Sequence, residues 1–303
     1  MLQWAALGLL LSTAGVITLS LSPQERILAR FSELSPNQQR LARFLLDHEA
    51  ELAFASVNAV SEQAGTSPAT VVRLCRALGY DGYTALQAAI RAQLPQYRTI
   101  AQKLADQMAN GGFSDNLPAQ IAQANSQNIQ TTLSQVAAAD LNEVVTAIIQ
   151  ARAIYVFGSG LSAAAATLAE YALSMLGLPA RACLHGGVAQ MLEVSRLGQD
   201  DLVIVIAIWR YLRHEVEAVN AARMAGVTCL VITDSPLSPI ANLADYVFFA
   251  ATEGAAHSRS LTGIISLIDL LSAAVAAKRA EQSIDALHRI DRLYREGGML
   301  WGE

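Results

Sequence analysis

The sequence is short of the residues that build metal centres and disulfide frameworks. Its three cysteines, Cys75, Cys183 and Cys229, lie far apart, and none has a second cysteine or a histidine at the spacing of a zinc-binding pair. Low-complexity runs and internal repeats are also lacking, and 53% of the 303 residues are hydrophobic. We therefore expect no metal and no cofactor in a globular chain long enough for two domains.

Charge is scarce and mostly negative. Only 16% of the residues are charged and the net charge is −5, which argues against a protein whose whole surface binds nucleic acid. Residues 22–100 nevertheless carry eight basic and seven acidic side chains, whereas residues 101–150 and 151–303 are each net negative. For a protein that binds one DNA site, a local pair of arginines matters more than the overall charge.

Such a pair lies in the segment GTSPATVVRLCRALGYDGY at residues 65–83. Ser67 is a good N-cap and Pro68 suits the first helical position, so a helix is expected to begin here. Apolar side chains at three- and four-residue spacing predict one buried face: Val71, Leu74, Cys75 and Leu78. Cys75 is thus expected to be a small buried residue, with a redox sensor as the alternative.

The other face of this helix is polar. Residues 57–64 form a short amphipathic segment that enters a tight turn at Gly65, and two short helices joined through glycine are typical of a helix-turn-helix. The two arginines of the second helix are one helical turn apart. We predict that five residues contact DNA: Ser67, Ala69, Thr70, Arg73 and Arg76. The pattern alone also fits an ordinary solvated helical hairpin.

Two stretches of this region resemble the N-terminal domain of RpiR-type bacterial transcriptional regulators. They are LSPNQQRLARFLLDHE at residues 34–49 and, more specifically, SPATVVRLCRALGYDGY at residues 67–83. The resemblance covers residues 34–94. It implies that the second stretch is the DNA-recognition helix and the turn after it.

Residues 1–21 contain no charge and are apolar. They lack the basic segment that begins a signal peptide. A spanning helix needs about 20 strongly apolar residues, whereas glycine and hydroxyl residues interrupt the apolar residues of this segment. The regulators that the chain resembles begin close to residues 21–34. We interpret residues 1–21 as an extension from an upstream start codon; a membrane anchor or a helix packed on the body are the alternatives.

Composition divides the rest of the chain. We expect a DNA-binding domain at residues 22–95, a linker and connecting helix at 96–139, and a second domain at 140–303. The loop cluster NGGFSDNLP at residues 110–118 marks the linker. Asp140 is expected to cap the next helix, with Glu143 completing a capping box.

From Ala153 onward, apolar runs alternate with helical segments. The runs AIYVFGSG, LPARACL, DLVIVIAI, VTCLVITD and ADYVFFA predict buried parallel strands in a doubly wound α/β domain. Ligands bind beyond the carboxyl ends of such strands. The first end, GSGLS, offers free N–H groups and hydroxyls to an anion, and its candidate residues are Gly158, Ser159, Gly160 and Ser162. A plain strand-to-helix turn is the alternative.

The order of these elements over residues 147–277 resembles the sugar isomerase (SIS) domain of RpiR-type regulators. The resemblance implies that Ser159 and Ser162 belong to a phosphate-binding loop. The second loop departs from the usual Ser-x-Ser-Gly-x-Thr pattern, because it reads AIWRYL at residues 207–212. Arg210 and Arg213 are candidates for an anion clamp beside an aromatic wall of Trp209 and Tyr211. Alternatively, Trp209 lies in the core and the arginines are solvated.

Catalysis by this domain would need a base and an acid near the strand ends. The candidates are Glu253, His257, His185 and Asp234, and none is flanked by a nucleophile or a set of metal ligands. We therefore predict a binding module rather than an enzyme. Glu253 is kept as a ligand-binding candidate, and Asp234 is expected to be a structural residue of its turn.

The predicted fold is an N-terminal all-α helix-turn-helix domain followed by a doubly wound, parallel-sheet SIS-like domain. The predicted protein is a cytoplasmic transcriptional regulator that binds a double-stranded DNA operator and senses a small anionic metabolite, a phosphorylated sugar or a related compound. Amphipathic helices near residues 260–279 and 283–294 suit a homodimer or higher homo-oligomer. An SIS-type sugar-phosphate isomerase is the alternative, and a membrane-tethered regulator is a third possibility.

Overall fold

The computed structural model describes residues 22–48, 52–94, 100–109, 112, 116–255, 258–299 and 301. Within these ranges no helix is long and apolar enough to cross a membrane. The expectation for residues 1–21 and the predicted domain boundary after residue 95 both lie outside the described residues. The described residues form two compact units, one with those up to Leu52 and Ser56–Gln93, the other with Ala53–Ala55 and those from Leu94 onward.

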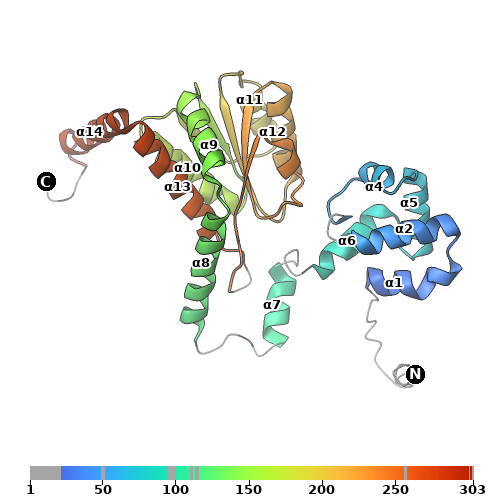
Figure 1. Cartoon of the computed structure of the whole chain (residues 1–303). Helices are drawn as coiled ribbons and strands as arrows, with labels where there is room; N and C mark the ends of the chain where they lie inside the picture. Colours follow the sequence, from blue (N-terminus) through green and yellow to red (C-terminus); the bar gives the residue numbers. More distant parts are fainter. Residues whose placement is uncertain are drawn as a thin grey trace. The chain divides into compact units, whose positions relative to one another are not determined.

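The first unit is entirely helical (Figure 1). Serines cap its first two α-helices: Ser22 and Glu25 form one capping box, and Ser35 and Gln38 form the other. Its elements are α1 (Pro23–Arg30), η1 (Phe31–Glu33), α2 (Pro36–Asp47), α4 (Val57–Gln63), α5 (Pro68–Ala77) and α6 (Tyr83–Gln93). Its core consists of buried side chains from successive helices, including Leu41, Leu45, Val60, Leu74 and Leu86.

The second unit contains a five-stranded parallel sheet with the order β2-β1-β3-β4-β5. Its strands are β1 (Ile154–Phe157), β2 (Ala180–Cys183), β3 (Leu202–Ala207), β4 (Thr228–Thr233) and β5 (Tyr246–Phe249). Every residue of β3 is buried, because helices cover both faces of the sheet (Figure 1). The doubly wound α/β architecture predicted from the apolar runs is therefore confirmed.

The other elements of the second unit are helices. They are α7 (Ile100–Ala109), α8 (Leu117–Ser134), α9 (Ala138–Gln150), α10 (Ser162–Met175), α11 (Val188–Val194), α12 (Arg213–Met224), η3 (Ala241–Leu243), α13 (Thr262–Lys278) and α14 (Ala280–Glu296). Side chains of α9, α10 and α13 join one core with alternate strand residues such as Ile204, and α12 joins the other with residues such as Val205. The strand residues divide between the two cores because successive side chains of a β-strand point to opposite faces of the sheet.

One expected helix start is wrong. α9 begins at Ala138 with Ala137 in the cap position, and no side chain caps it. Asp140 therefore lies inside the first turn. An acidic side chain is favourable there because it faces the positive end of the helix dipole, so the residue stabilises the helix without capping it.

Candidate functional site

The predicted recognition helix is α5, and its exposed side carries a chain of hydrogen bonds. Ser67 is the N-cap, and its hydroxyl accepts from the backbone N–H of Thr70 at 3.3 Å. The hydroxyls of Ser67 and Thr70 are 2.9 Å apart. Arg73 Nη2 in turn donates to Thr70 Oγ1 at 3.0 Å. Three of the five predicted DNA-binding residues are thus linked to one another.

Burial separates the two faces of α5. Val71, Leu74, Cys75 and Leu78 are fully buried, whereas Ser67, Ala69, Arg73 and Arg76 are exposed and Thr70 is half-buried. Burial raises the pKa of the Cys75 thiol to about 11. Because the thiolate is the reactive form, this favours a packing role for the cysteine over redox sensing.

The turn between α4 and α5 requires its glycine. Gly65 has a φ of +60°, a conformation that other residues rarely adopt. Its N–H donates to Glu62 O at 3.1 Å, and the N–H of Thr66 donates to Ser61 O at 2.8 Å, which closes the end of α4. Ser56 caps the start of α4. The two short helices joined through glycine are therefore present as predicted.

Two arginines of α1 support the end of α5, a role that sequence reasoning missed. Arg30 Nη1 donates to Ala77 O at 2.6 Å, and Arg26 Nη1 donates to Gly79 O at 3.4 Å. Cationic donors are favourable at a helix C-terminus, where carbonyl groups lack helical partners. These contacts span about fifty residues of sequence, so no local pattern signals them.

In the second unit, the GSGLS segment joins β1 to α10 at the carboxyl edge of the sheet. A Cβ on Gly158 would lie 2.7 Å from Ser162 O, so the strand and the helix approach too closely for a side chain. Gly160 has a φ of +57°. Ser162 is the first residue of α10 and is buried, while Ser159 Oγ lies 2.8 Å from His214 Nε2.

The loop after β3 is anchored to the end of β4 by Asp234. Its carboxylate accepts from Tyr211 OH at 2.7 Å and from the N–H of Trp209 at 3.3 Å. It also pairs with Arg259 at 3.1 Å, with side-chain exposures of 3% for the aspartate and 9% for the arginine. The structural role expected for Asp234 agrees with these contacts, whereas Arg259 was not anticipated.

A cavity of about 350 Å³ opens beside these two loops. It brings together four of the predicted ligand-binding residues, Ser159, Gly160, Ser162 and Arg210. Trp209 also lines it, as do Lys103 and Arg259, so three cationic side chains border the space. The hydroxyls and cations are donors suited to an anion.

Other predicted ligand-binding residues lie elsewhere. Gly158 is buried at the end of β1, and Arg213 is exposed at the start of α12; neither lines this cavity. Glu253 lines a different cavity, and its backbone N–H and carbonyl bond to the amide of Asn128. Tyr211 points its hydroxyl to Asp234. The predicted aromatic wall is thus reduced to Trp209.

Glu215 is a lining residue that the sequence analysis missed. Its side chain is buried at 3% exposure, and its carboxylate accepts from the N–H of Leu212 at 3.1 Å. Burial raises its pKa to about 7, although hydrogen bonds from the N–H groups of Leu212 and Ser159 oppose the shift. A glutamate three residues after the N-cap position could have indicated a capping contact, but not its burial.

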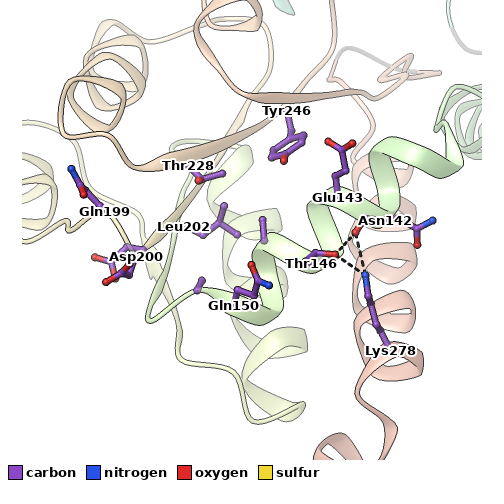
Figure 2. Close-up of a pocket in the computed structure, with 13 residues that line it drawn as sticks. Asn142, Glu143, Thr146, Gln150, Gln199, Asp200, Leu202, Thr228, Tyr246 and Lys278 are labelled. Atoms are coloured by element: carbon purple, nitrogen blue, oxygen red, sulfur yellow. Dashed lines mark hydrogen bonds between the residues drawn. The ribbon is translucent and has the colours of Figure 1, made fainter.

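A second cavity, of about 590 Å³, lies at the opposite edge of the sheet (Figure 2). Its lining includes the first residues of three strands, Leu202, Thr228 and Tyr246. Lys278 Nζ, at its border, donates to Thr146 Oγ1 at 2.6 Å and to Asn142 O at 3.4 Å. Parallel sheets bind ligands at the carboxyl ends of their strands, so the 350 Å³ cavity is the better candidate.

Two of the candidate catalytic groups, Asp234 and Glu253, line the same further cavity, where Asp234 is already bonded to Tyr211 and paired with Arg259. His185 and Glu253 are exposed, and His257 lies outside the described residues. Within the described ranges, no group of three or more histidine, cysteine, aspartate or glutamate side chains could hold a metal ion.

Comparisons with known proteins match both units. Residues 22–96 match the helix-turn-helix domain of the rpiR family, and residues 147–277 match the SIS domain. An uncharacterised HTH-type transcriptional regulator of Caldanaerobacter subterraneus is 27% identical over 82% of this chain and 88% of that protein. YbbH of Bacillus subtilis, another HTH-type transcriptional regulator, is 24% identical over the same shares.

Two solved structures are similar. The sugar isomerase domain of an RpiR transcription factor from Sphaerobacter thermophilus is 36% identical, with a TM-score of 0.58, and covers 59% of this chain and 100% of that one. The Vibrio vulnificus NanR protein, solved with ManNAc-6P, is 22% identical, with a TM-score of 0.65, over 90% and 98% of the two chains. The second likeness concerns the fold alone.

Proposed function

The chain belongs to the RpiR family of transcriptional regulators, and from this premise we propose that it binds an operator through α5 and senses a compact anionic metabolite at the carboxyl edge of its sheet. The 350 Å³ cavity carries the second part of the proposal. It combines Ser159 and Ser162 from one loop with Arg210 from the next.

The chemistry of the lining favours an anion. Charged donors make shorter and stronger hydrogen bonds to anions than neutral hydroxyls do, and a guanidinium can engage a carboxylate or phosphate with two parallel bonds. The volume lies near the low end of the roughly 300–1,000 Å³ range of ligand pockets, and Trp209 occupies one side. The ligand is therefore a phosphate or carboxylate metabolite smaller than a hexose phosphate, or differently shaped.

A thermal-shift panel tests this assignment. Purified protein is screened against carboxylate and phosphate metabolites, including hexose and hexosamine phosphates, since NanR was solved with ManNAc-6P. The responding ligand should lose its effect in Ser162→Ala and Arg210→Ala. Arg223→Ala, an exposed arginine on the last turn of α12, is the matched control and should respond like the wild type. A strong thermal shift with a hexose phosphate that Arg210→Ala does not diminish would contradict the proposal.

The isomerase alternative rests on Glu215. This carboxyl lines the cavity, and a pKa of about 7 suits a general base. Two observations favour the regulator: the chain carries a helix-turn-helix, and its relatives are named regulators. Turnover of a sugar phosphate by the wild type, lost in Glu215→Gln, would instead establish the enzyme.

A further inference from the structure

Three elements of the second unit meet at His214, a residue that neither sequence motif includes. Its ring nitrogen Nε2 lies 2.8 Å from Ser159 Oγ, at the loop after β1. Its backbone carbonyl accepts from Gln190 Nε2, on α11, at 2.5 Å. Its ring lies against Gly186, in the loop after β2. The residue is therefore held at both its backbone and its side chain.

These contacts fix the direction of the ring. A Cβ on Gly186 would lie 2.9 Å from three atoms of the imidazole, so glycine is required for the ring to lie there. Gln190 is buried at 4% exposure, and its bond holds the first turn of α12. The contact with Ser159 and the close approach to Gly186 together hold the ring with Nε2 directed at the serine hydroxyl.

The proton on this histidine decides what Ser159 offers to the cavity. A neutral imidazole carries its proton on one of its two nitrogens, and a hydroxyl has a single hydrogen to donate. If Nε2 is bare, the Ser159 hydroxyl donates to it and presents lone pairs to the cavity. If Nε2 is protonated, it donates to Ser159 Oγ, and the hydroxyl hydrogen is free to point at a ligand oxygen.

We propose that His214 is a positioning residue that turns the Ser159 hydroxyl toward the ligand, and that an anion binds best when Nε2 carries the proton. The inference rests on the proposed anion site. It also narrows the ligand class, because the group placed at Ser159 must be an acceptor only, such as an ionised phosphate or carboxylate. A ligand hydroxyl that donates a hydrogen bond at this position would favour the bare nitrogen.

The direct test follows the ring nitrogens by NMR in full-length protein labelled with ¹⁵N-histidine and ¹⁵N-serine, with inorganic phosphate as the probe. Comparison with His214→Gln assigns the ring signals. Saturating phosphate should shift the backbone amides of Ser159 and Ser162 and move Nε2 to its protonated resonance. In Ser159→Ala the change at Nε2 should be absent.

Two contrary results are distinguishable. If phosphate shifts the serine amides while Nε2 remains unprotonated, the inference about His214 is wrong and the anion site stands. If phosphate shifts neither amide, the anion site itself fails, and the inference fails with it.

A pair of variants separates positioning from packing. His214→Gln retains an N–H donor for Ser159, whereas His214→Leu fills the space without one. We expect phosphate affinity within about threefold of the wild type for the glutamine variant and a loss of roughly tenfold for the leucine variant, the scale of one net hydrogen bond. Equal affinities in the two variants, with both shown to be folded by thermal unfolding, would contradict the proposal.

Discussion

Glu215 lies in the first turn of α12 with its carboxyl buried at 3% exposure. Burial raises its pKa from 4.5 to about 7, and the N–H groups that bond to it only partly offset this effect. The folded protein therefore binds this proton more tightly than the unfolded chain does. By linkage, the stability associated with the group is fully present below about pH 4.5 and declines as the pH rises to about 7.

Glu215→Gln should remove this pH dependence. The amide keeps an oxygen for the N–H of Leu212 but never ionises, so the free energy of unfolding of the variant should rise relative to the wild type between pH 5 and pH 8. The increase should reach at most about 3 kcal/mol. Urea unfolding at several pH values measures it, with the exposed Glu217→Gln on the same helix as control. A constant difference between Glu215→Gln and the wild type would contradict the burial effect.

Arg73 and Arg76 are exposed on the face of α5 that the core leaves free. Replacing either by alanine should leave the fold intact and cost on the order of 1–3 kcal/mol of operator binding. If the lost contact is to a phosphate, the slope of log binding constant against log salt concentration should also become shallower by about one. Fluorescence anisotropy with operator DNA measures both quantities, and Arg295→Ala on α14 is the control. An unchanged affinity for operator DNA in the double variant Arg73→Ala, Arg76→Ala would show that α5 is not the recognition helix.

At the scale of elements, the sequence predicted what depends on local spacing. The caps at Ser35 and Ser67, the buried face of α5 and the alternation of strands and helices all follow from residues a few positions apart. The contacts that shape the candidate site join distant residues. Ser159 meets His214, and Asp234 meets Arg259, only because the parallel sheet brings its loops to one edge.

Local patterns also failed where two residues competed for one role. Asp140 is a better N-cap than Ala137 by residue type, yet α9 begins earlier, with Ala137 in the cap position. Similarly, Arg210 and Arg213 are equivalent candidates in the sequence, but only Arg210 lines the cavity. Arg213 is the first residue of α12, and its side chain is exposed to solvent.

The junction between β1 and α10 provides a test at this scale. Gly158→Ala would place a Cβ 2.7 Å from Ser162 O and 2.9 Å from Ala166 Cβ, both parts of packed elements. We expect a loss of about 1–3 kcal/mol of stability, as for overpacking of a core, and a lower thermal midpoint for the second unit. Gly82→Ala meets nothing within 4 Å and should be tolerated. Equal stability of the two variants would show that β1 and α10 are not packed this closely.

At the scale of the whole molecule, apolar side chains remain exposed on the C-terminal helices. α13 buries one face within its own unit, including Ile264, Leu267 and Leu271, whereas Ile284 and Leu287, which are neighbours on one face of α14, are exposed. An apolar helix face of this kind suits self-association. A two-fold symmetric dimer would match a palindromic operator.

We propose that this face joins two protomers, and charges placed on it should then separate them. We expect the double variant Ile284→Asp, Leu287→Asp to be monomeric by light scattering coupled to size exclusion and to bind a palindromic operator more weakly than the wild type. Gln282→Asp, at an exposed polar position of the same helix, should remain oligomeric. A double variant with the mass of the wild type would place the interface elsewhere.

The most direct measurement is the affinity of full-length protein for its operator, by fluorescence anisotropy, with and without the anion selected by thermal shift. We predict that the anion changes operator affinity in the wild type, and that Ser162→Ala and Arg210→Ala bind operator without responding to it. An anion that alters operator affinity equally in the wild type and in both variants would contradict the assignment of the effector site.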